Sequence, residues 1–454
     1  MAIKKLLIAN RGEIAVRVVR AAQGLGIPTV QAHSMADADS LAVKMADEAV
    51  DIGPPHAAKS YLNIDAILKA ARDTNADAIH PGYGFLSENA AFAQAVEDAG
   101  LIFVGPRPET ISRLGDKAAA REAAETAKVP TVPGSDGLIE STEAAKDAAS
   151  RIGYPVMIKA SAGGGGRGIK IAENESQLEK LVSEARNEAQ AAFGNGALYM
   201  EKVIRNARHI EVQVLGDGVN AVHCFERECS LQRRRQKVWE EAPSAALNDS
   251  QRKAICESAV ALARSVGYRG AGTLEFLFDD ASGEHYFIEM NTRIQVEHPV
   301  TEMITGIDLV AEMIRIAGGE PLRFQQSDVT LNGHAIECRI NAEDPSNNFM
   351  PGPGVIDRLS VPAADHVRFD TMLYEGYQVP PFYDSLLGKL IVHGPDRQTA
   401  IDRMAEALEG LTIDGLKTTI PLHRELAKAA PIRSNDIHTQ FLEPWLEANP
   451  IPSE

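Results

Sequence analysis

Polar side chains at alternate positions carry the strongest chemical signal in this sequence. In an extended segment, successive side chains point to opposite faces. If residues 287–299 (FIEMNTRIQVEHP) are extended, one face presents Glu289, Asn291, Arg293, Gln295 and Glu297. A half-buried strand with its polar face in water has the same alternation. The stretch predicts either such a strand or a binding face.

A second carboxylate is predicted to face this stretch. Residues 272–278 have the pattern of a strand, and residues 279–283 (DDASG) supply turn chemistry before the next one. A hairpin centred near Ser282 places Glu275 opposite Glu289. Two facing carboxylates repel unless a proton or a cation lies between them, and a few carboxylates suit Mg²⁺, which is often shared with phosphate. We therefore predict a metal site of Glu275, Glu289 and Asn291, with a phosphate-binding element elsewhere.

A glycine-rich segment is the candidate phosphate element. Lys159 ends a predicted strand and is followed by five glycines within six positions, 163–168. Glycine lets backbone N–H groups approach a phosphate closely, and a lysine offsets its charge. The spacing does not match GxxxxGK[ST], and a glycine run alone is often a flexible turn. The nearby lysine and the paired carboxylates favour phosphate binding.

Three further positions could serve either structure or binding. Residues 232–237 (QRRRQK) place four cations within five residues of a chain whose formal charge is −17, so the cluster is either a solvated face or an anion site. His209 lies in an alternating segment, 208–215, and is either a strand-edge histidine or a residue that contacts the nucleotide. Arg339 shares a predicted strand face with Glu337 and Asn341. It either forms an ordinary buried ion pair or has a functional role.

Composition limits the class of protein. The chain of 454 residues is long enough for two or three domains, and 44% hydrophobic with 24% charged residues is ordinary for a globular protein. With 46 basic and 63 acidic residues, a general nucleic-acid or anionic-membrane surface is not expected. The four cysteines have no CxxC spacing, so we expect no disulfide framework and a reducing cytoplasm. No run is long enough to span a membrane.

Alternating strands and helices are predicted to position these groups. Residues 4–105 alternate short apolar runs with helical segments, which is typical of an open, mostly parallel α/β layer. This layer has no GxGxxG after its first strand, so it could be purely structural. Downstream we predict helices over 116–128, 176–194, 251–266, 306–316 and 398–409, a connector at 129–134, and a strand-rich stretch over 355–389.

Five segments in order resemble one family. They are 80–89 (HPGYGFLSEN), 159–168 (KASAGGGGRG), 232–237 (QRRRQK), 289–299 (EMNTRIQVEHP) and 337–343 (ECRINAE). Together they closely resemble biotin carboxylase, of the ATP-grasp superfamily, and the likeness runs from Lys5 to about Leu442.

The resemblance implies a fold that is α/β and α+β, in three parts. An N-terminal Rossmann-like (pre-ATP-grasp) α/β domain would span 1–115, and a central ATP-grasp domain 116–330, with a mobile glycine-rich lid at about 131–204. A C-terminal biotin carboxylase domain would span 331–446, followed by a tail at 447–454.

It also implies an ATP-dependent ligase reaction. Bicarbonate attacks the γ-phosphate of MgATP to give carboxyphosphate, and the CO₂ released carboxylates the ureido nitrogen of biotin on a carrier protein. The cofactors implied are ATP and Mg²⁺, for which Mn²⁺ can substitute; bicarbonate is a substrate, and biotin is carried on a partner.

Residue roles follow from the matching positions. The catalytic residues would be Arg293, Glu297, Arg339 and Lys237. ATP would be bound by Lys117, Lys159, Gly165, Gly166, Glu201, Lys202, Ile204, His209, Gln232, Arg235, Glu275, Glu289 and Ile437. Bicarbonate would be bound by Lys237, Arg293, Gln295, Val296 and Glu297, biotin by Tyr83 and Arg339, and the metal by Glu275, Glu289 and Asn291. Glu297 would take the proton of bicarbonate, and Arg339 would stabilise the biotin enolate.

One position departs from the family pattern. Arg235 stands where many relatives have histidine in the QRRHQK motif. Arginine is always charged, so a pH-dependent role is lost there while phosphate contact is retained.

The predicted function is the biotin carboxylase subunit of a multisubunit acyl-CoA carboxylase, in the cytoplasm. No AMKM biotin-attachment segment occurs in the chain, so we expect a separate biotin carboxyl carrier protein, a separate carboxyltransferase subunit and a homodimer, with no nucleic acid or membrane as partner. Two alternatives stay open. Another ATP-grasp ligase acting through an acyl phosphate would not need Glu297 or Arg339, and a non-catalytic nucleotide-binding scaffold would have damaged metal or base positions.

Overall fold

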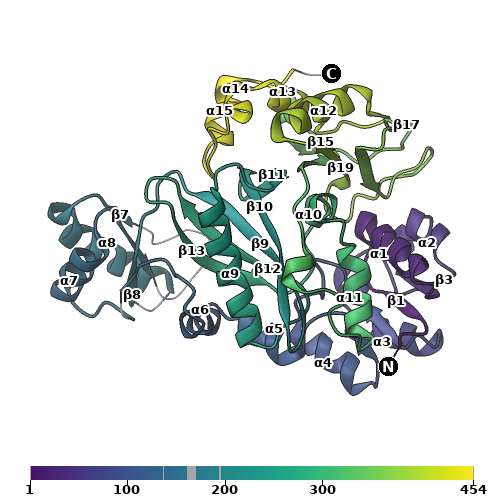
Figure 1. Cartoon of the computed structure of the whole chain (residues 1–454), viewed down its shortest axis with the longest axis horizontal. Coiled ribbons are helices and arrows are strands. Elements are labelled where there is room, and N and C mark those ends of the chain that lie inside the picture. Colours follow the sequence, from purple (N-terminus) through teal and green to yellow (C-terminus); the bar gives the residue numbers. More distant parts are fainter. Residues whose placement is uncertain (1, 136, 161–169, 194–195, 453–454) are drawn as a thin grey trace.

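A parallel five-stranded sheet forms the N-terminal part of the chain. The computed structural model describes residues 2–135, 137–160, 170–193 and 196–452 (Figure 1). The sheet has the order β3 (Glu48–Asp51), β2 (Thr29–His33), β1 (Leu6–Ile8), β4 (Ala78–His80) and β5 (Ile102–Phe103), with every pairing parallel. Its helices are α1 (Gly12–Gly24), α2 (Leu41–Met45), α3 (Ile64–Asp73) and α4 (Ala90–Asp98). The predicted α/β layer is confirmed.

Side-chain caps fix where several helices begin. Asn63 and Asn89 accept hydrogen bonds from backbone N–H groups in the first turns of α3 and α4. Asp116 does the same for α6 (Lys117–Thr126), which lies within the predicted helix at 116–128. α5 (Pro108–Gly115) precedes it.

A small α/β unit with its own core follows a connector. Its antiparallel sheet has the order β7 (Lys170–Ala172), β6 (Val156–Ala160) and β8 (Leu198–Lys202), and α7 (Thr142–Ile152) and α8 (Glu175–Phe193) pack on it. The predicted glycine loop, 161–169, lies outside the described residues. Figure 1 shows this unit at the left, away from the N-terminal and C-terminal parts.

An eight-stranded sheet forms the centre of the molecule and continues into the C-terminal part. Its order is β13 (Glu284–Asn291), β12 (Arg269–Asp279), β9 (Arg208–Asp217), β10 (Ala221–Arg233), β11 (Gln236–Ala242), β14 (His334–Asn341), β19 (Leu386–Gly394) and β18 (Val367–Thr371). All its pairings are antiparallel. One ladder therefore joins strands predicted for the central domain to strands predicted for the C-terminal one.

Helices cover this sheet. α9 (Asp249–Ser265) begins at a capping box of Asn248 and Gln251 and packs on β9 and β10. α10 (His298–Thr305) packs on β14, and α11 (Leu309–Ala317) packs on β12 and α1.

Short elements complete the C-terminal part, at the top of Figure 1. The strands are β15 (Glu343–Asp344), β16 (Met350–Pro351), β17 (Arg358–Ser360) and β20 (Thr412–Asp414), and the helices are α12 (Arg397–Gly410), α13 (Ile420–Lys428), α14 (Ala430–Arg433) and α15 (Leu442–Ala448).

Single 3₁₀ turns occur at η1 (Met35–Asp37), η2 (Ala57–Lys59), η3 (Gln326–Asp328) and η4 (Pro345–Asn347). All four cysteines are free thiols, and all four are buried. Among the described residues, none of the helices combines the length and apolar character that crossing a membrane requires.

The prediction of one extended segment over 287–299 is wrong beyond Asn291. β13 ends at Asn291, and Glu297 is the residue before α10. Thr292 donates its backbone N–H to Glu88, which lies outside the sheet, instead of continuing a ladder (3.0 Å). Pro299 lies at the start of α10, where its fixed φ favours a helix. Residues 292–296 therefore form a loop that leads from the strand into the helix.

Candidate functional site

A cavity of about 1060 Å³ collects most of the predicted site residues. Those that line it are Tyr83, His209, Gln232, Arg235, Lys237, Glu275, Glu289, Asn291, Arg293, Gln295, Val296, Glu297 and Arg339. They come from the β9, β10–β11, β12–β13 and β14 segments, the 292–297 loop and the turn after β4. The fold thus gathers polar groups that are far apart in the chain.

The two predicted metal carboxylates are cross-strand partners, as expected from the hairpin. Glu275 pairs with Glu289 in the β12–β13 ladder. Burial raises the pKa of Glu289, and the charge of Glu275 raises it further. Burial also acts to raise the pKa of Glu275, but the charge of Lys237 and the nearby imidazole of His209 outweigh it and hold that pKa well below its usual value. Because burial and the charge of Glu275 disfavour the ionised form of Glu289, the pair fits a divalent cation, which would relieve the repulsion.

Asn291 is partly committed to other groups. Its Nδ2 donates to Glu275 Oε1 (2.9 Å), while its Oδ1 accepts from Arg293 Nη2 (3.1 Å). The oxygen predicted to contact the metal therefore faces a guanidinium in this structure. Glu275 and Glu289 make the better-supported pair of metal ligands.

Lys237 is the centre of a buried ion cluster. Its ammonium donates to Glu211 Oε2 (2.5 Å), Glu297 Oε1 (2.6 Å) and Glu275 Oε1 (3.2 Å). Burial acts to lower the pKa of Lys237, but the charges of Glu211 and Glu297 outweigh it, so the pKa lies well above its usual value. The lysine therefore stays charged and can hold an anion at the cavity wall.

Glu297 lies between two cations. Its side chain is 1% exposed, and its second oxygen accepts from Arg339 Nη2 (3.0 Å). Burial and the charge of Glu211 act to raise the pKa of Glu297, but Lys237 and Arg339 outweigh them, and the pKa is lowered. An ionised carboxylate inside a cavity is the state that a general base requires.

Arg293 contacts other groups than the expected base. Its guanidinium donates to Glu88 Oε2 (2.8 Å) and Gln295 Oε1 (2.8 Å) as well as to Asn291. The cation that joins Lys237 at Glu297 is Arg339, although Arg293 lines the same cavity.

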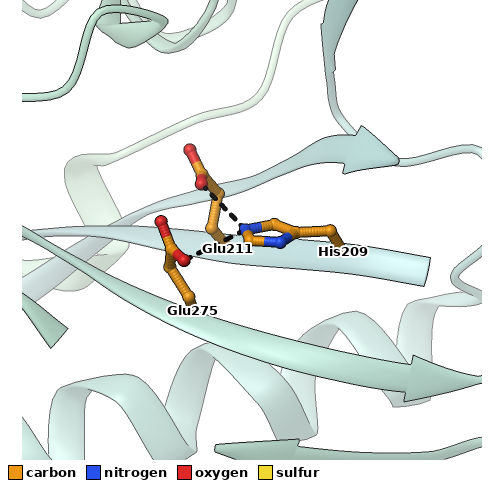
Figure 2. Close-up of side chains that lie close together, drawn as sticks. All are labelled: His209, Glu211 and Glu275. Carbon is orange, nitrogen blue, oxygen red and sulfur yellow. Dashed lines mark ion pairs between the residues drawn. The ribbon is translucent and has the colours of Figure 1, made fainter. Parts of the chain in front are cut away.

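His209 lies beside two of these carboxylates (Figure 2). Its Nε2 is 3.4 Å from Glu211 Oε2 and 3.4 Å from Glu275 Oε2. Burial and Lys237 act to lower the pKa of His209, but its interactions with Glu211 and Glu275 raise it to about 9. The ring is therefore a cation at neutral pH, which suits contact with an anionic ligand.

Arg339 connects the large cavity to a smaller one of about 190 Å³. Its Nε donates to the buried Glu240 (2.6 Å). Burial raises the pKa of Glu240 to about 7, with Arg339 opposing and Glu297 adding to the shift. Tyr83, Lys237 and Arg339 line both cavities.

The predicted basic cluster divides between two environments. Arg234 and Arg235 form the turn between β10 and β11, are exposed and line the large cavity. Arg233 stacks on Phe349, 3.8 Å from the ring centre. Lys237, with a side chain 12% exposed, faces inward. The exposed arginines can meet an anion that enters, while Lys237 meets one that is already inside.

Six predicted nucleotide residues lie away from the cavity lining. Lys159 and Glu201, on β6 and β8 of the small unit, form an ion pair with each other, and Lys202 and Ile204 are half-buried near them. Lys117 is exposed, and Ile437 is buried in the core. Gly165 and Gly166 lie outside the described residues.

The sequence reasoning missed several residues of the cluster. Glu211 bonds Lys237 and also accepts from the buried Arg227 (2.7 Å). Its signal was present, because the alternation that places His209 on one face of β9 places Glu211 there too. Glu240 and Glu88 reach the site from β11 and from the turn after β4, and no local pattern marks them.

Known proteins resemble this chain over nearly its full length. Three family models match: the N-terminal domain of biotin carboxylase (residues 2–111), the ATP-binding domain of the carbamoyl-phosphate synthase L chain (116–325) and the C-terminal domain of biotin carboxylase (337–444). Biotin carboxylase from Nostoc sp. is 54% identical over 444 residues, 98% of this chain and 99% of that protein.

Solved structures of biotin carboxylases also resemble this chain over nearly its full length. The biotin carboxylase domain of a thermophilic 2-oxoglutarate carboxylase bound to ADP matches with a TM-score of 0.92 and 51% identity, over 97% of this chain and 98% of that one. The biotin carboxylase subunit of a pyruvate carboxylase matches with a TM-score of 0.92 and 50% identity, over 100% of both chains.

Proposed function

This chain belongs to the biotin carboxylase family of ATP-dependent ligases, and from that premise we propose that it carboxylates biotin on a separate carrier protein, using ATP and bicarbonate. The observation that carries the proposal is the position of Glu297. This ionised carboxylate lies between Lys237 and Arg339, in the cavity that Glu275 and Glu289 also line.

Glu297 acts as the base for bicarbonate in this proposal. Lys237 holds the anion, with Arg293, Gln295 and the Val296 segment on the same wall. Removing the proton leaves a stronger nucleophile, whose oxygen would attack the γ-phosphorus of ATP. The bond to the bridging oxygen breaks, ADP leaves and carboxyphosphate forms. The charge that grows in this step is offset by Lys237 and Arg293.

Glu275 and Glu289 would hold Mg²⁺, or Mn²⁺ in its place, and Asn291 Oδ1, which accepts a hydrogen bond from Arg293, would be a third ligand. The bound ion supplies charge neutralisation for the phosphates. His209, Gln232 and Arg235 contact the nucleotide from the cavity side.

The remaining nucleotide contacts come with the lid. Lys159, Gly165, Gly166, Glu201, Lys202 and Ile204 belong to the predicted lid, and Lys117 and Ile437 lie outside it in the sequence. We propose that the lid moves about the 129–135 connector, which hydrogen-bonds both β13 and the small unit: Phe287 N donates to Pro130 O, and Lys202 N to Pro133 O. Closure protects carboxyphosphate from water.

The smaller cavity holds the ureido ring of biotin. Tyr83 forms one wall of this cavity. Arg339 stabilises the enolate that would form when the ring nitrogen passes its proton to the phosphate that carboxyphosphate releases together with CO₂. Because Arg339 also contacts Glu297, the two half-sites meet at one guanidinium.

The wider setting is proposed with the reaction. The domains are 1–115, 116–330, 331–446 and a tail at 447–454, and the chain acts as a cytoplasmic homodimer beside a biotin carboxyl carrier protein and a carboxyltransferase subunit. The whole complex transfers the carboxyl group to an acyl-CoA. The similar enzymes are named for 2-oxoglutarate and pyruvate, so these two compounds should be tested beside acyl-CoA as acceptors of the carboxyl group.

The proposal is tested with labelled bicarbonate, ATP, Mg²⁺ and free biotin. We expect label in carboxybiotin and bicarbonate-dependent phosphate release. Bicarbonate-independent phosphate release driven by another carboxylic acid would favour an acyl-phosphate ligase, and nucleotide binding without turnover would favour a scaffold.

A further inference from the structure

Lys389 is a fully buried lysine at the junction of the three parts of the chain. It lies on β19, directly opposite Arg339 of β14 and Asp370 of β18, with no exposed surface. Its ammonium donates to the backbone carbonyl of Val296 (2.8 Å) and lies 3.1 Å from Glu13 Oε2. A side chain of the C-terminal part thus contacts both α1 and the loop that carries Glu297.

The contact with Val296 fixes the orientation of one particular peptide group. The carbonyl of Val296 belongs to the same planar unit as the N–H of Glu297. Residues 292–296 belong to neither a strand nor a helix, so their conformation depends on such contacts. Glu88 holds the start of this loop through Thr292 N (3.0 Å) and Arg293 Nε (2.8 Å), and Lys389 holds its end.

Glu13 links Lys389 to the wall of the smaller cavity. Glu13 is 2% exposed on α1 and accepts a hydrogen bond from the hydroxyl of Tyr83. A continuous chain of contacts therefore runs from Tyr83 through Glu13 and Lys389 to the peptide before Glu297.

Stability alone is a weak reason for these charges. Burying an ammonium and a carboxylate costs several kcal/mol per ion, and apolar side chains of similar volume often give equal or greater stability. An apolar residue at this position could not donate a hydrogen bond, whereas Lys389 donates one to Val296 O and so fixes the orientation of that carbonyl.

We propose that Lys389, with Glu13 as its counter-ion, is a positioning residue for Glu297. By holding the Val296 carbonyl, Lys389 keeps the Glu297 carboxylate against Lys237 and Arg339. The role of Glu297 as the base rests on the proposed function; the positioning of its loop does not.

The test compares Lys389→Met with Arg397→Met as a matched control. Arg397 is also a largely buried cation of the C-terminal part that binds a buried carboxylate, Glu241 (2.6 Å), and a backbone carbonyl, Ile432 O (2.7 Å), but it lies outside the cavity lining. Both variants lose a buried ion pair, and only Lys389→Met loses the contact with the loop.

Two readouts decide the proposal. In Lys389→Met, amide hydrogen exchange of the peptide covering 292–298 rises about tenfold or more, as does the KM for bicarbonate in ATP hydrolysis, while the KM for MgATP stays within about twofold. Arg397→Met leaves all three near wild type. If both variants change these quantities alike, or Lys389→Met changes none of them, the positioning role is wrong.

A second variant covers poor folding of the first. Glu13→Gln keeps the side-chain shape and removes the counter-ion of Lys389, so hydrogen exchange of the 292–298 peptide and the KM for bicarbonate should both rise, by a smaller factor. If neither quantity changes in Glu13→Gln, the proposal is contradicted. If the wild-type protein lacks bicarbonate-dependent hydrolysis, the proposed function fails, while the exchange comparison still decides the role of Lys389.

Discussion

Glu275 and Glu289 face each other across the β12–β13 ladder, and their environments differ. Glu275 receives hydrogen bonds from Asn291 and Gln295 and forms an ion pair with Lys237. The pKa of Glu289, in contrast, is raised by burial and then by the nearby charge of Glu275. One carboxylate is already compensated and the other is not, which is a suitable arrangement for a cation that arrives with a nucleotide.

Replacing Glu289 should abolish the effect of Mg²⁺ on ADP affinity without lowering the free energy of unfolding of the metal-free protein. Without metal, Glu289→Gln removes a repulsion, so we expect the free energy of unfolding to stay constant or rise by about 0.2–1 kcal/mol. The gain in ADP affinity that Mg²⁺ provides should be lost. Urea denaturation and calorimetric titration of ADP with and without Mg²⁺ measure both effects. A large loss of stability in the metal-free protein, with the Mg²⁺ effect intact, would contradict the assignment.

Lys237 should be essential to the fold of the site. Lys237→Met leaves Glu211, Glu275 and Glu297 without their shared cation, so we expect a loss of roughly 3–5 kcal/mol in the free energy of unfolding. The double variant Lys237→Met/Glu297→Gln removes one of the stranded charges and should recover part of that loss. Urea denaturation of the single and double variants gives the comparison. Additive losses would show that the two groups do not interact.

Arg235 should affect ligand binding without affecting stability. It is exposed in the β10–β11 turn and lines the large cavity, so Arg235→Ala should change the unfolding free energy by less than about 0.5 kcal/mol. MgATP affinity should fall severalfold at low salt, and by less at high salt because salt screens exposed charges. Titrations at two ionic strengths test this, with melting temperature as the control. Unchanged affinity at low salt would remove Arg235 from the nucleotide site.

The parallel layer and the hairpin register were predicted from alternation and turn residues, which are local signals, whereas most of the cavity lining was predicted from the family resemblance. The register placed Glu275 opposite Glu289 from the position of Ser282 alone. Lys237, Glu275 and Glu297 were predicted as site residues, but the bonds that join them were not. Glu240, Glu13 and Lys389 were missed because they reach the site from distant elements and no local pattern marks them. The loop at 292–296 was missed because alternation continues in the sequence after the ladder has ended at Asn291.

Acid should destabilise the protein through Glu241. Burial acts to raise the pKa of Glu241, but Arg397 and His334 lower it from 4.5 to about 2. A carboxyl with a lowered pKa stabilises the fold fully above its unfolded pKa, and this contribution is lost as pH falls from about 4.5 towards 2. At pH 7 we expect Glu241→Gln to cost roughly 3 kcal/mol. The difference from wild type in urea denaturation should shrink below about pH 4.5; a difference that stays constant down to pH 3 would contradict this.

Glu297→Gln tests the central claim most directly, with MgATP affinity and bicarbonate-dependent turnover measured on the same preparation. The account predicts a dissociation constant for MgATP within about twofold of wild type, and a loss of labelled carboxybiotin formation of about 10²–10⁴-fold. Near-normal carboxybiotin formation by a folded Glu297→Gln protein would contradict the assignment of Glu297 as the base.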